Sequence, residues 1–423
     1  MKKKTDIKSL KRRLFNFSSI IKINEIINST LNLKELLTTI MEICKEVMRV
    51  EASSLMLKDE KTGELTYEVA LGEKGKEIKK FRLKKGQGIA GWVAEKEKPL
   101  LIPDVKKDPR FNNQLDQSTG FKTKSILAVP MKVKGKVIGI LEAINPHQPF
   151  GEEEVELFTT FANQSGIAIE NARLHQFLLE RQKVEEELRI ARLIQNNLLP
   201  QKYPDVKGIQ FWARNIPVAG ISGDFYDFIE LGKEQIGIVL GDICGKGIPA
   251  ALFMAKTISD FKLVASLHKK AGKTMDAINN ILAESATLGL FVTLIYLLID
   301  SKNRTLTYVN AGHPAPLIKR LGKVKLLEGE KGLPLGVSSD FSFKENKIKL
   351  RKGDLLFIYT DGLSEAKGKN GKRFSSEKIL NLVKDGPNDA AGLGKEVLQK
   401  IKFFSRGEPA SDDLTLVAIK VEK

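Results

Sequence analysis

The sequence has few of the residues that build disulfide-braced or zinc-binding proteins. Its 423 residues include two cysteines, Cys44 and Cys244, which lie far apart. Two such thiols do not make a disulfide framework and are typical of a reducing compartment. No spacing typical of metal ligands occurs among the four histidines, which are His147, His175, His268 and His313.

Long apolar runs are also missing. The most apolar stretch, Leu288 to Ile299, ends at Asp300 and is too short to cross the ~30 Å hydrocarbon layer of a membrane. The N-terminal lysines are followed by further charged residues and not by the apolar segment of a secretory signal. We therefore expect a cytoplasmic protein without a transmembrane segment.

Basic residues are in excess, and the formal net charge of +17 makes nucleic-acid binding an alternative. However, Lys and Arg are spread along the whole chain and interleaved with Asp and Glu, and no helix-turn-helix or zinc pattern occurs. We therefore expect no nucleic-acid partner. The length and the 42% of hydrophobic residues predict two or more ordinary globular domains.

The apolar spacing divides the chain into four parts. Residues 1–31 predict a basic helix, and residues 32–171 an α+β module that begins with helical spacing and continues with alternating strands. The strands are expected at 53–58, 64–71, 126–133 and 136–144, with a hairpin turn at Lys61-Thr62-Gly63. A linker helix follows over 172–199, and residues 200–423 form a domain dominated by strands.

The linker helix carries a heptad pattern. Its spacings alternate between three and four at Leu174, Phe177, Arg181, Val184, Leu188, Ala191, Gln195 and Leu198. Arg181 and Gln195 interrupt the apolar seam, and Pro200 ends the helix. The pattern predicts either a long surface helix on its own domain or a parallel coiled coil joining two protomers. We favour the coiled coil, and with it a homodimer.

Beyond Pro200 the sequence predicts strands at 235–240, 291–299, 305–309, 354–359 and 414–421, with helices at 249–266 and 274–284. A large antiparallel sheet system with helices on its outside is the packing that this pattern favours.

Acidic residues lie at the ends of these strands. Asp224 precedes a strand, Asp242 and Asp361 follow apolar runs, and Asp412 and Asp413 precede the last strand. Any one of them taken alone is best explained as a turn residue. Together they predict carboxylates that converge at one sheet edge and repel each other unless cations neutralise them. Oxygen ligands without His or Cys select Mg²⁺ or Mn²⁺.

The C-terminal part resembles the metal-dependent PPM protein phosphatases, in the branch of the stage II sporulation protein E and the sigma-factor regulatory phosphatases. The resemblance runs from about Ile190 to the C-terminus. It rests on Gln195 with Leu198-Leu199-Pro200, Gly223-Asp224-Phe225-Tyr226-Asp227, Gly241-Asp242-Ile243-Cys244-Gly245-Lys246-Gly247, Asn310-Ala311-Gly312-His313-Pro314, Gly353-Asp354, Thr360-Asp361-Gly362 and Asp412-Asp413-Leu414-Thr415. It implies an αββα sandwich.

The same resemblance implies two Mn²⁺ or Mg²⁺ ions. Asp242 would bridge them, the Ile243 carbonyl would complete one shell, Asp224 would serve one ion, and Asp361 and Asp412 the other. A water activated by the ions would hydrolyse phosphoserine or phosphothreonine directly. The arginine with which many eukaryotic-type relatives hold phosphate has no counterpart that we can place.

Several neighbouring residues have two interpretations. Asp227 fits either a water-orienting role or a strand surface, and no role is assigned to Asp413. His313 fits a general acid or, as we favour, a structural loop residue. Lys246 lies between two glycines, but a P-loop requires Ser or Thr where Gly247 stands.

Residues 32–171 resemble a GAF domain. The resemblance rests on Gly86-Gln87-Gly88-Ile89-Ala90-Gly91-Trp92-Val93, Ile102-Pro103-Asp104-Val105, Ser125-Ile126-Leu127-Ala128-Val129-Pro130 and Ile169-Glu170-Asn171. It implies a sensor that binds a small molecule or a module that dimerises. The Asn-Lys and Asp-Glu signature of cyclic-nucleotide binders is broken at Pro146 and Val155, so the sequence does not specify a ligand.

These inferences combine into one functional prediction. The protein is expected to be a GAF-controlled serine/threonine phosphatase. By resemblance alone, its substrate is a phosphorylated STAS-type anti-sigma-factor antagonist in a partner-switching pathway. The alternative is a catalytically weak or inactive sensory scaffold that binds a signalling partner.

Overall fold

The computed structural model describes residues 30–71, 81–218, 220–285, 289–369, 371–408 and 410–422. Residues 1–29 of the expected basic helix lie outside these ranges. The chain divides into two compact units, Met1–Lys183 and Val184–Lys423, with the boundary inside one helix, α6 (Glu152–Leu198). That boundary falls within the linker expected over residues 172–199. Within the described ranges, no helix combines the length and apolarity needed to cross a bilayer.

The N-terminal unit is built on a six-stranded sheet in the order β3-β2-β1-β6-β5-β4, with all its neighbouring strands antiparallel. The strands are β1 (Val50–Lys58), β2 (Leu65–Leu71), β3 (Arg82–Leu83), β4 (Leu100–Ile102), β5 (Ile126–Val133) and β6 (Lys136–Pro146). The expected hairpin between β1 and β2 is present. Asp59 accepts hydrogen bonds from the N–H groups of Lys61 and Thr62, and Gly63 takes the left-handed backbone at φ 74°.

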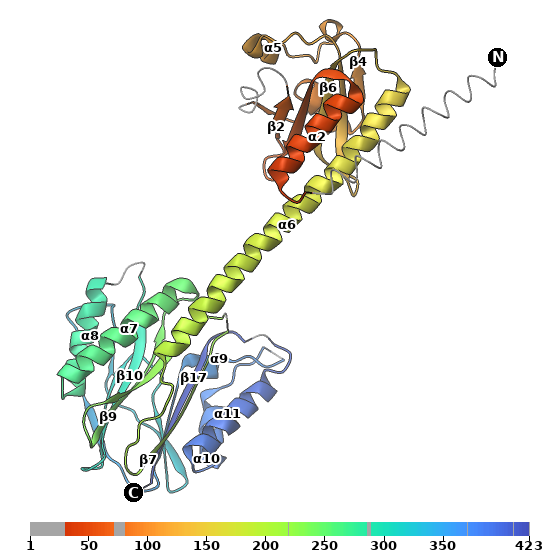
Figure 1. Ribbon diagram of the computed structural model, residues 1–423. Coiled ribbons are helices and arrows are strands. Elements are labelled where there is room, and N and C mark those ends of the chain that lie inside the picture. The colour runs from red at the N-terminus through yellow and green to blue at the C-terminus, as the bar shows by residue number, and fades with distance from the viewer. Residues whose placement is uncertain are drawn as a thin grey trace. The chain divides into compact units, whose positions relative to one another are not determined.

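Helices cover both faces of this sheet (Figure 1). Helix α2 (Leu33–Met48) and the first part of α6 pack on one face, and α4 (Gly88–Lys96) packs on the other. Two shorter helices, η1 (Val105–Lys107) and α5 (Gln114–Thr119), lie in the connection from β4 to β5. The Asn32 side chain caps α2 by accepting from the N–H groups of Lys34 and Glu35.

The C-terminal unit contains two sheets. One has the order β14-β11-β10-β9-β8, with β15 also paired to β11, and the other has the order β13-β12-β16-β17-β7. The strands are β7 (Ile209–Ile216), β8 (Phe225–Glu230), β9 (Gln235–Ile243), β10 (Val292–Asp300), β11 (Thr305–Ala311), β12 (Leu317–Arg320), β13 (Lys323–Leu326), β14 (Lys331–Gly332), β15 (Asn346–Lys349), β16 (Leu355–Tyr359) and β17 (Leu414–Val421).

The two sheets pack face to face, and helices cover their outer faces. Along β16, Leu356 and Ile358 face the other sheet, whereas Leu355 and Phe357 face the outer helices, which is the alternation expected of a strand buried on both faces. Helices α7 (Ile248–Leu267) and α8 (Ala271–Ser285) cover the first sheet, and α10 (Ser376–Asp385) and α11 (Ala390–Phe404) cover the second (Figure 1). The expected αββα sandwich is confirmed.

A buried ion pair links two strands of the second sheet. Asp354, immediately before β16, is 0% exposed, and both of its carboxylate oxygens accept from Arg320 of β12, at 2.8 and 2.6 Å. The Arg351 N–H also donates to Asp354, at 2.7 Å. The Gly353-Asp354 motif is thus a structural element of the sandwich.

Candidate metal centre

Four of the chain segments singled out in the sequence meet at one end of the sandwich. Asp224 directly precedes β8, Asp242 is the next-to-last residue of β9, Asp361 begins the short helix α9 (Asp361–Glu365) after β16, and Asp412 lies two residues before β17. Phe225 pairs with Gly241, which brings Asp224 beside Asp242. Strand β16 pairs with β17, which brings the Asp361 segment beside the Asp412 segment.

Asp224 is the most enclosed of these carboxylates, at 1% exposure. Its Oδ2 accepts from the hydroxyls of Thr360, at 2.7 Å, and Thr415, at 2.8 Å. Burial, and after it the charge of Asp242, raise the pKa of Asp224 well above its usual value, and the two hydroxyls oppose that rise. Two threonines from the second sheet therefore hold an aspartate that precedes a strand of the first.

The pKa values of Asp242 and Asp361 are raised by burial and by neighbouring negative charge. Burial and then the charge of Asp361 raise the pKa of Asp242 to about 7, against the opposing effect of its hydrogen bond with Asp224. Burial and then the charge of Asp412 raise the pKa of Asp361. The four carboxylates therefore interact, and each added cation would favour their ionised forms.

One protein cation already contacts this cluster. The Lys246 Nζ lies 3.1 Å from Oδ2 of Asp412 and donates to the carbonyl of Ser411 at 2.8 Å. Its charge also lowers the pKa of Asp361. Gly245 and Gly247 on either side have φ values of 116° and 76°, and Pro249 lies in the first turn of α7. The segment is a turn into a helix that presents an ammonium group to Asp412.

Asp413 has a different function from its neighbour. Its Oδ1 accepts from the N–H of Val218 at 2.8 Å, and its Oδ2 accepts from the N–H of Gly223 at 3.0 Å. Both oxygens thus hold the loop that leads to Asp224. Gly362 packs against the same segment: a Cβ there would lie 1.9 Å from the Asp413 carbonyl oxygen and 3.4 Å from that of Asp412.

Further residues around Asp224 were not anticipated as parts of the site. The Asn215 side chain donates to the carbonyl of Asp224 at 3.1 Å and to the hydroxyl of Thr415 at 2.8 Å. Gln195, expected in a coiled-coil seam, is buried and exchanges two hydrogen bonds with the backbone of Ser222. Gln195 belongs to one of the quoted motifs, whereas Asn215 belongs to none, and no local pattern indicates either contact.

The two ambiguous residues are accounted for by local contacts. Asp227 is buried, pairs with Lys262 of α7 at 2.9 Å and accepts from the N–H of Phe228, so it lies inside the unit and not on the strand surface. His313 is 1% exposed, and its Nδ1 lies 2.9 Å from the Thr293 hydroxyl. Burial lowers the pKa of His313 to about 3, so the ring is neutral at pH 7, as a structural loop residue requires.

The candidate ligands are all oxygen atoms, which hard divalent cations such as Mg²⁺ and Mn²⁺ prefer. Each candidate side chain is a carboxylate, and burial followed by repulsion from a neighbouring carboxylate raises the pKa of Asp242 and Asp361. The Ile243 carbonyl oxygen faces the Asp224 loop, since a Cβ on Gly223 would lie 3.3 Å from it. Among the described residues, no three acidic, His or Cys side chains already form a metal cage. The carboxylates would have to draw together around the ions.

The fold defines the class of this protein. The solved SiaA-PP2C domain of Pseudomonas aeruginosa matches with a TM-score of 0.52 and 20% sequence identity, over 57% of this chain and 98% of that one. The C-terminal unit therefore has the PP2C phosphatase fold.

Sequence comparison identifies the family. The family described as Stage II sporulation protein E (SpoIIE) matches residues 232–422, and the GAF domain family matches residues 32–169. Phosphoserine phosphatase RsbU of Bacillus subtilis (strain 168) is 31% identical over 247 residues, which are 56% of this chain and 71% of that protein. Phosphoserine phosphatase RsbP of the same organism is 25% identical over 243 residues, 56% of this chain and 58% of that protein. The chain belongs to the SpoIIE family of PP2C-type serine/threonine phosphatases and carries a GAF domain.

Proposed function

We propose that the protein is a metal-dependent phosphatase acting on phosphoserine or phosphothreonine in a protein substrate. Two Mn²⁺ or Mg²⁺ ions would be held by Asp224, Asp242, the Ile243 carbonyl, Asp361 and Asp412. The observation that carries the proposal is the convergence of four carboxylates at one end of a PP2C-type sandwich, where burial and then the charge of Asp361 raise the pKa of Asp242 to about 7. When bound, two such ions activate water and stabilise the charge of the phosphoryl group during transfer.

The residues of the chain have separate tasks in this proposal. Thr360 and Thr415 fix Oδ2 of Asp224, so that this carboxylate cannot rotate away when the cluster is charged. Asp413 holds the preceding loop through two N–H groups. Burial and then the charge of Asp361 raise the pKa of Asp242, and this carboxyl group must lose its proton before it can bind a metal ion. Lys246 neutralises Asp412 and must give way there to a metal ion.

The direct test uses the full-length protein and a phosphoserine peptide. Phosphate release should require Mn²⁺ or Mg²⁺ and stop on addition of EDTA. Asp242→Asn and Asp361→Asn should each remove nearly all turnover without unfolding the protein. Turnover that survives EDTA, or that is unchanged in both variants, would eliminate the two-ion proposal. A folded wild type that binds a partner but never hydrolyses a phosphopeptide would favour the scaffold alternative.

We propose, on family resemblance, that the substrate is a phosphorylated STAS-type anti-sigma-factor antagonist in a cytoplasmic partner-switching pathway. Two matched relatives are named as phosphoserine phosphatases, which supports the chemistry of the substrate. The test compares the phosphorylated STAS proteins of the same cell with a generic phosphoserine peptide. One of them should be hydrolysed at least about a hundredfold more efficiently, as expected for recognition beyond the phosphoryl group. Equal efficiencies would reject this substrate class.

We further propose that the GAF domain controls the phosphatase through α6, in a homodimer whose linker helices form a coiled coil. Helix α6 continues from the GAF domain into the catalytic unit, and its expected seam residues Leu174, Phe177 and Val184 are 53%, 58% and 54% exposed in the single chain. A partner helix would bury them. A small molecule bound by the GAF domain, or dimerisation itself, would set the state of the helix.

Regulation of the phosphatase through α6 can be tested by changing the heptad register of the helix. Insertion of four residues at Leu188 shifts the heptad register, and Leu188→Asp separates the helices. Each variant should change turnover, and Leu188→Asp should lower the mass seen by analytical ultracentrifugation to that of a monomer. A monomeric wild type whose turnover equals that of both variants would reject the dimer and the control together.

A further inference from the structure

The last turn of α6 is attached to the loop that carries Asp224. The Gln195 Nε2 donates to the carbonyl of Ser222 at 2.7 Å, and its Oε1 accepts from the N–H of Ser222 at 2.8 Å. Gln195 is 6% exposed and Ser222 is 2% exposed. A carboxamide offers one donor group and one acceptor, so a single side chain satisfies both backbone groups of one buried residue.

Ser222 is one of several points at which this loop is held. The Ser222 hydroxyl accepts from the N–H of Asp224 at 3.0 Å, so the residue bound by Gln195 contacts the candidate metal ligand directly. Asp413 and Asn215 hold the neighbouring N–H and carbonyl groups. Gln195 differs from these two because it belongs to the helix that enters from the GAF domain, whereas they belong to the sandwich.

We propose that Gln195 is a positioning residue that sets the geometry of Asp224 and makes metal binding depend on the last turn of α6. This inference rests on the proposed metal-dependent function. Groups that hold a metal ligand from behind typically change metal affinity by about 10- to 100-fold when they are removed. Any displacement of the last turn of α6 would act on Asp224 through the same two hydrogen bonds.

The experiment measures Mn²⁺ affinity of the full-length protein by calorimetry or by the electron paramagnetic resonance of free Mn²⁺. Gln195→Ala should raise the dissociation constant by about 10- to 100-fold. Asn197→Ala is the matched control, because Asn197 is exposed on the same turn of the helix, and it should leave affinity unchanged. Gln195→Glu keeps the acceptor but not the donor and should fall between wild type and Gln195→Ala.

The outcomes separate this inference from the proposed function. If Asp242→Asn abolishes Mn²⁺ binding while Gln195→Ala and Gln195→Glu retain wild-type affinity and differ only in melting temperature, Gln195 is merely structural and the inference is wrong. If wild type shows no Asp242-dependent Mn²⁺ binding, the proposed function fails first. If Gln195→Ala does not fold, the Mn²⁺ affinity of Gln195→Glu is compared with that of wild type instead, and an unchanged affinity would show that the inference is wrong.

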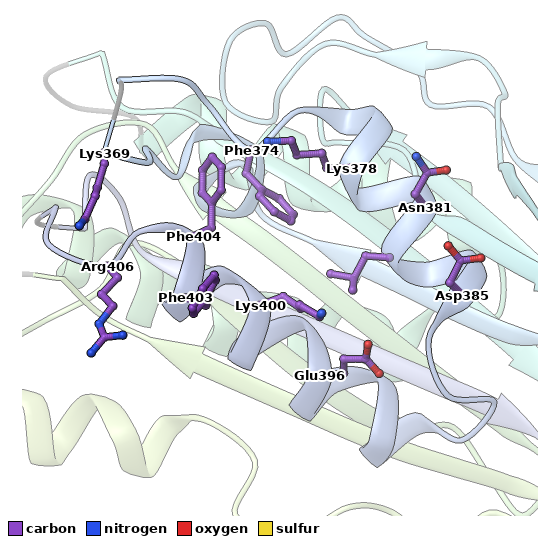
Figure 2. Close-up of a pocket in the computed structure, with 11 residues that line it drawn as sticks. Lys369, Phe374, Lys378, Asn381, Asp385, Glu396, Lys400, Phe403, Phe404 and Arg406 are labelled. Carbon is purple, nitrogen blue, oxygen red and sulfur yellow. The ribbon is translucent and has the colours of Figure 1, made fainter.

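A second inference concerns a groove of about 770 Å³ between α10 and α11, on the outer side of the second sheet. Figure 2 shows Lys369 and Arg406 at one end and Asp385 and Glu396 at the other. Aromatic rings line the basic half, and one of them, Phe403, is 74% exposed. Aromatic residues and arginine are enriched at protein interfaces, and this groove combines them.

The basic side chains of this groove are available to a partner. Within the ranges that the structure describes, Lys369, Lys400 and Arg406 are exposed and form no salt bridge. Lys378 lies 4.4 Å from the centre of the Phe404 ring. The groove is also close in the chain to the candidate centre. Lys369 lies four residues beyond α9, which begins with Asp361, and Gly368 packs against the Phe404 ring.

We infer that this groove docks an acidic segment of the phosphoprotein substrate that carries a large apolar side chain. The apolar side chain would pack on Phe403 and Phe404, and the carboxylates would face Lys369, Lys400 and Arg406. Such a surface raises the efficiency of hydrolysis for a protein without touching the phosphoryl group. Here too the inference depends on the proposed phosphatase activity.

The test compares phosphorylated casein, an acidic phosphoserine protein, with p-nitrophenyl phosphate, which has nothing to dock. Reversing Lys400 and Arg406 to Glu should lower kcat/KM for casein on the order of tenfold and leave p-nitrophenyl phosphate unchanged. The matched control reverses Lys384 of α10 and Lys395 of α11, which are exposed on the two helices that border the groove but do not line it. Equal effects of both pairs, or equal losses with both substrates, would overturn the docking site. Absence of wild-type turnover on either substrate would instead overturn the phosphatase.

Discussion

Gly362→Ala offers the sharpest steric test of the candidate centre. Gly362 follows Asp361 in α9, and a Cβ at this position would lie 1.9 Å from the Asp413 carbonyl oxygen. Real Cβ atoms essentially never come closer than ~3.0 Å to another heavy atom, so one backbone must shift by about 1 Å. The atom in the way is backbone and not the end of a flexible side chain. The shift would separate the Asp361 and Asp412 segments.

The expected magnitudes follow from that displacement. Overpacking of a tight contact costs about 1–3 kcal/mol of folding free energy. A misplacement of about 1 Å in a catalytic group costs on the order of a hundredfold in rate. We therefore expect Gly362→Ala to retain a cooperative unfolding transition, to lose about a hundredfold in kcat, and to bind Mn²⁺ more weakly.

The control is a similar clash placed elsewhere in the same unit. A Cβ on Gly394 of α11 would lie 2.0 Å from the Trp212 ring, and Trp212 pairs with Ala418 of β17 and not with the end of that strand next to Asp413. Gly394→Ala should destabilise the protein without weakening Mn²⁺ binding. Urea unfolding and phosphate release from a phosphoserine peptide are measured for both variants. If Gly362→Ala keeps wild-type turnover and Mn²⁺ affinity, the close packing of α9 on the Asp412–Asp413 segment has no part in the centre.

Three further predictions follow from the charged groups. The pKa of Asp242 is raised to about 7, so the metal-free folded protein holds a proton that the unfolded chain releases near pH ~4. As pH rises from about 4 to 7, the stability of the metal-free protein should therefore fall and its affinity for Mn²⁺ should rise. Melting temperatures and calorimetric Mn²⁺ affinities that do not change between about pH 5 and 8 would refute this prediction. Lys246→Gln should tighten Mn²⁺ binding, since it removes the ammonium 3.1 Å from Asp412, and weaker binding would contradict competition. Asp354→Asn should cost about 1–3 kcal/mol in urea unfolding, because it removes the carboxylate that holds Arg320, whose side chain is 30% exposed; no measurable loss would show that water replaces that carboxylate.

The sequence predicted the parts of the fold that depend on local pattern. Alternating apolar residues located β2 to within about two residues, and apolar runs located β5 and β17, because strands that are buried on both faces are apolar throughout. The Asp59 and Gly63 turn chemistry located the first hairpin. The acidic residues at strand ends indicated the candidate centre, since strands that share a sheet end at a common edge.

The remaining features depend on tertiary contacts that no local pattern reports. Gln195 fits a heptad position by spacing, yet its partner Ser222 lies 27 residues away. Thr360 and Thr415 approach Asp224 only because β16 and β17 pair in one register and the two sheets then meet. Hydrogen bonds of this kind depend on strand register and sheet packing, so they can be predicted only after both are known.

The central claim is that the acidic cluster forms a two-ion catalytic centre. Its most direct test counts Mn²⁺ ions bound per full-length chain while phosphate release from a phosphoserine peptide is followed in the same titration. The control is Asp227→Asn, which changes a buried aspartate that pairs with Lys262. Wild type should bind two ions per chain and gain activity as they bind. Asp242→Asn should lose both the ions and the activity, and Asp227→Asn should retain both. Full activity in Asp242→Asn, or activity in wild type before any Mn²⁺ is bound, would contradict the central claim.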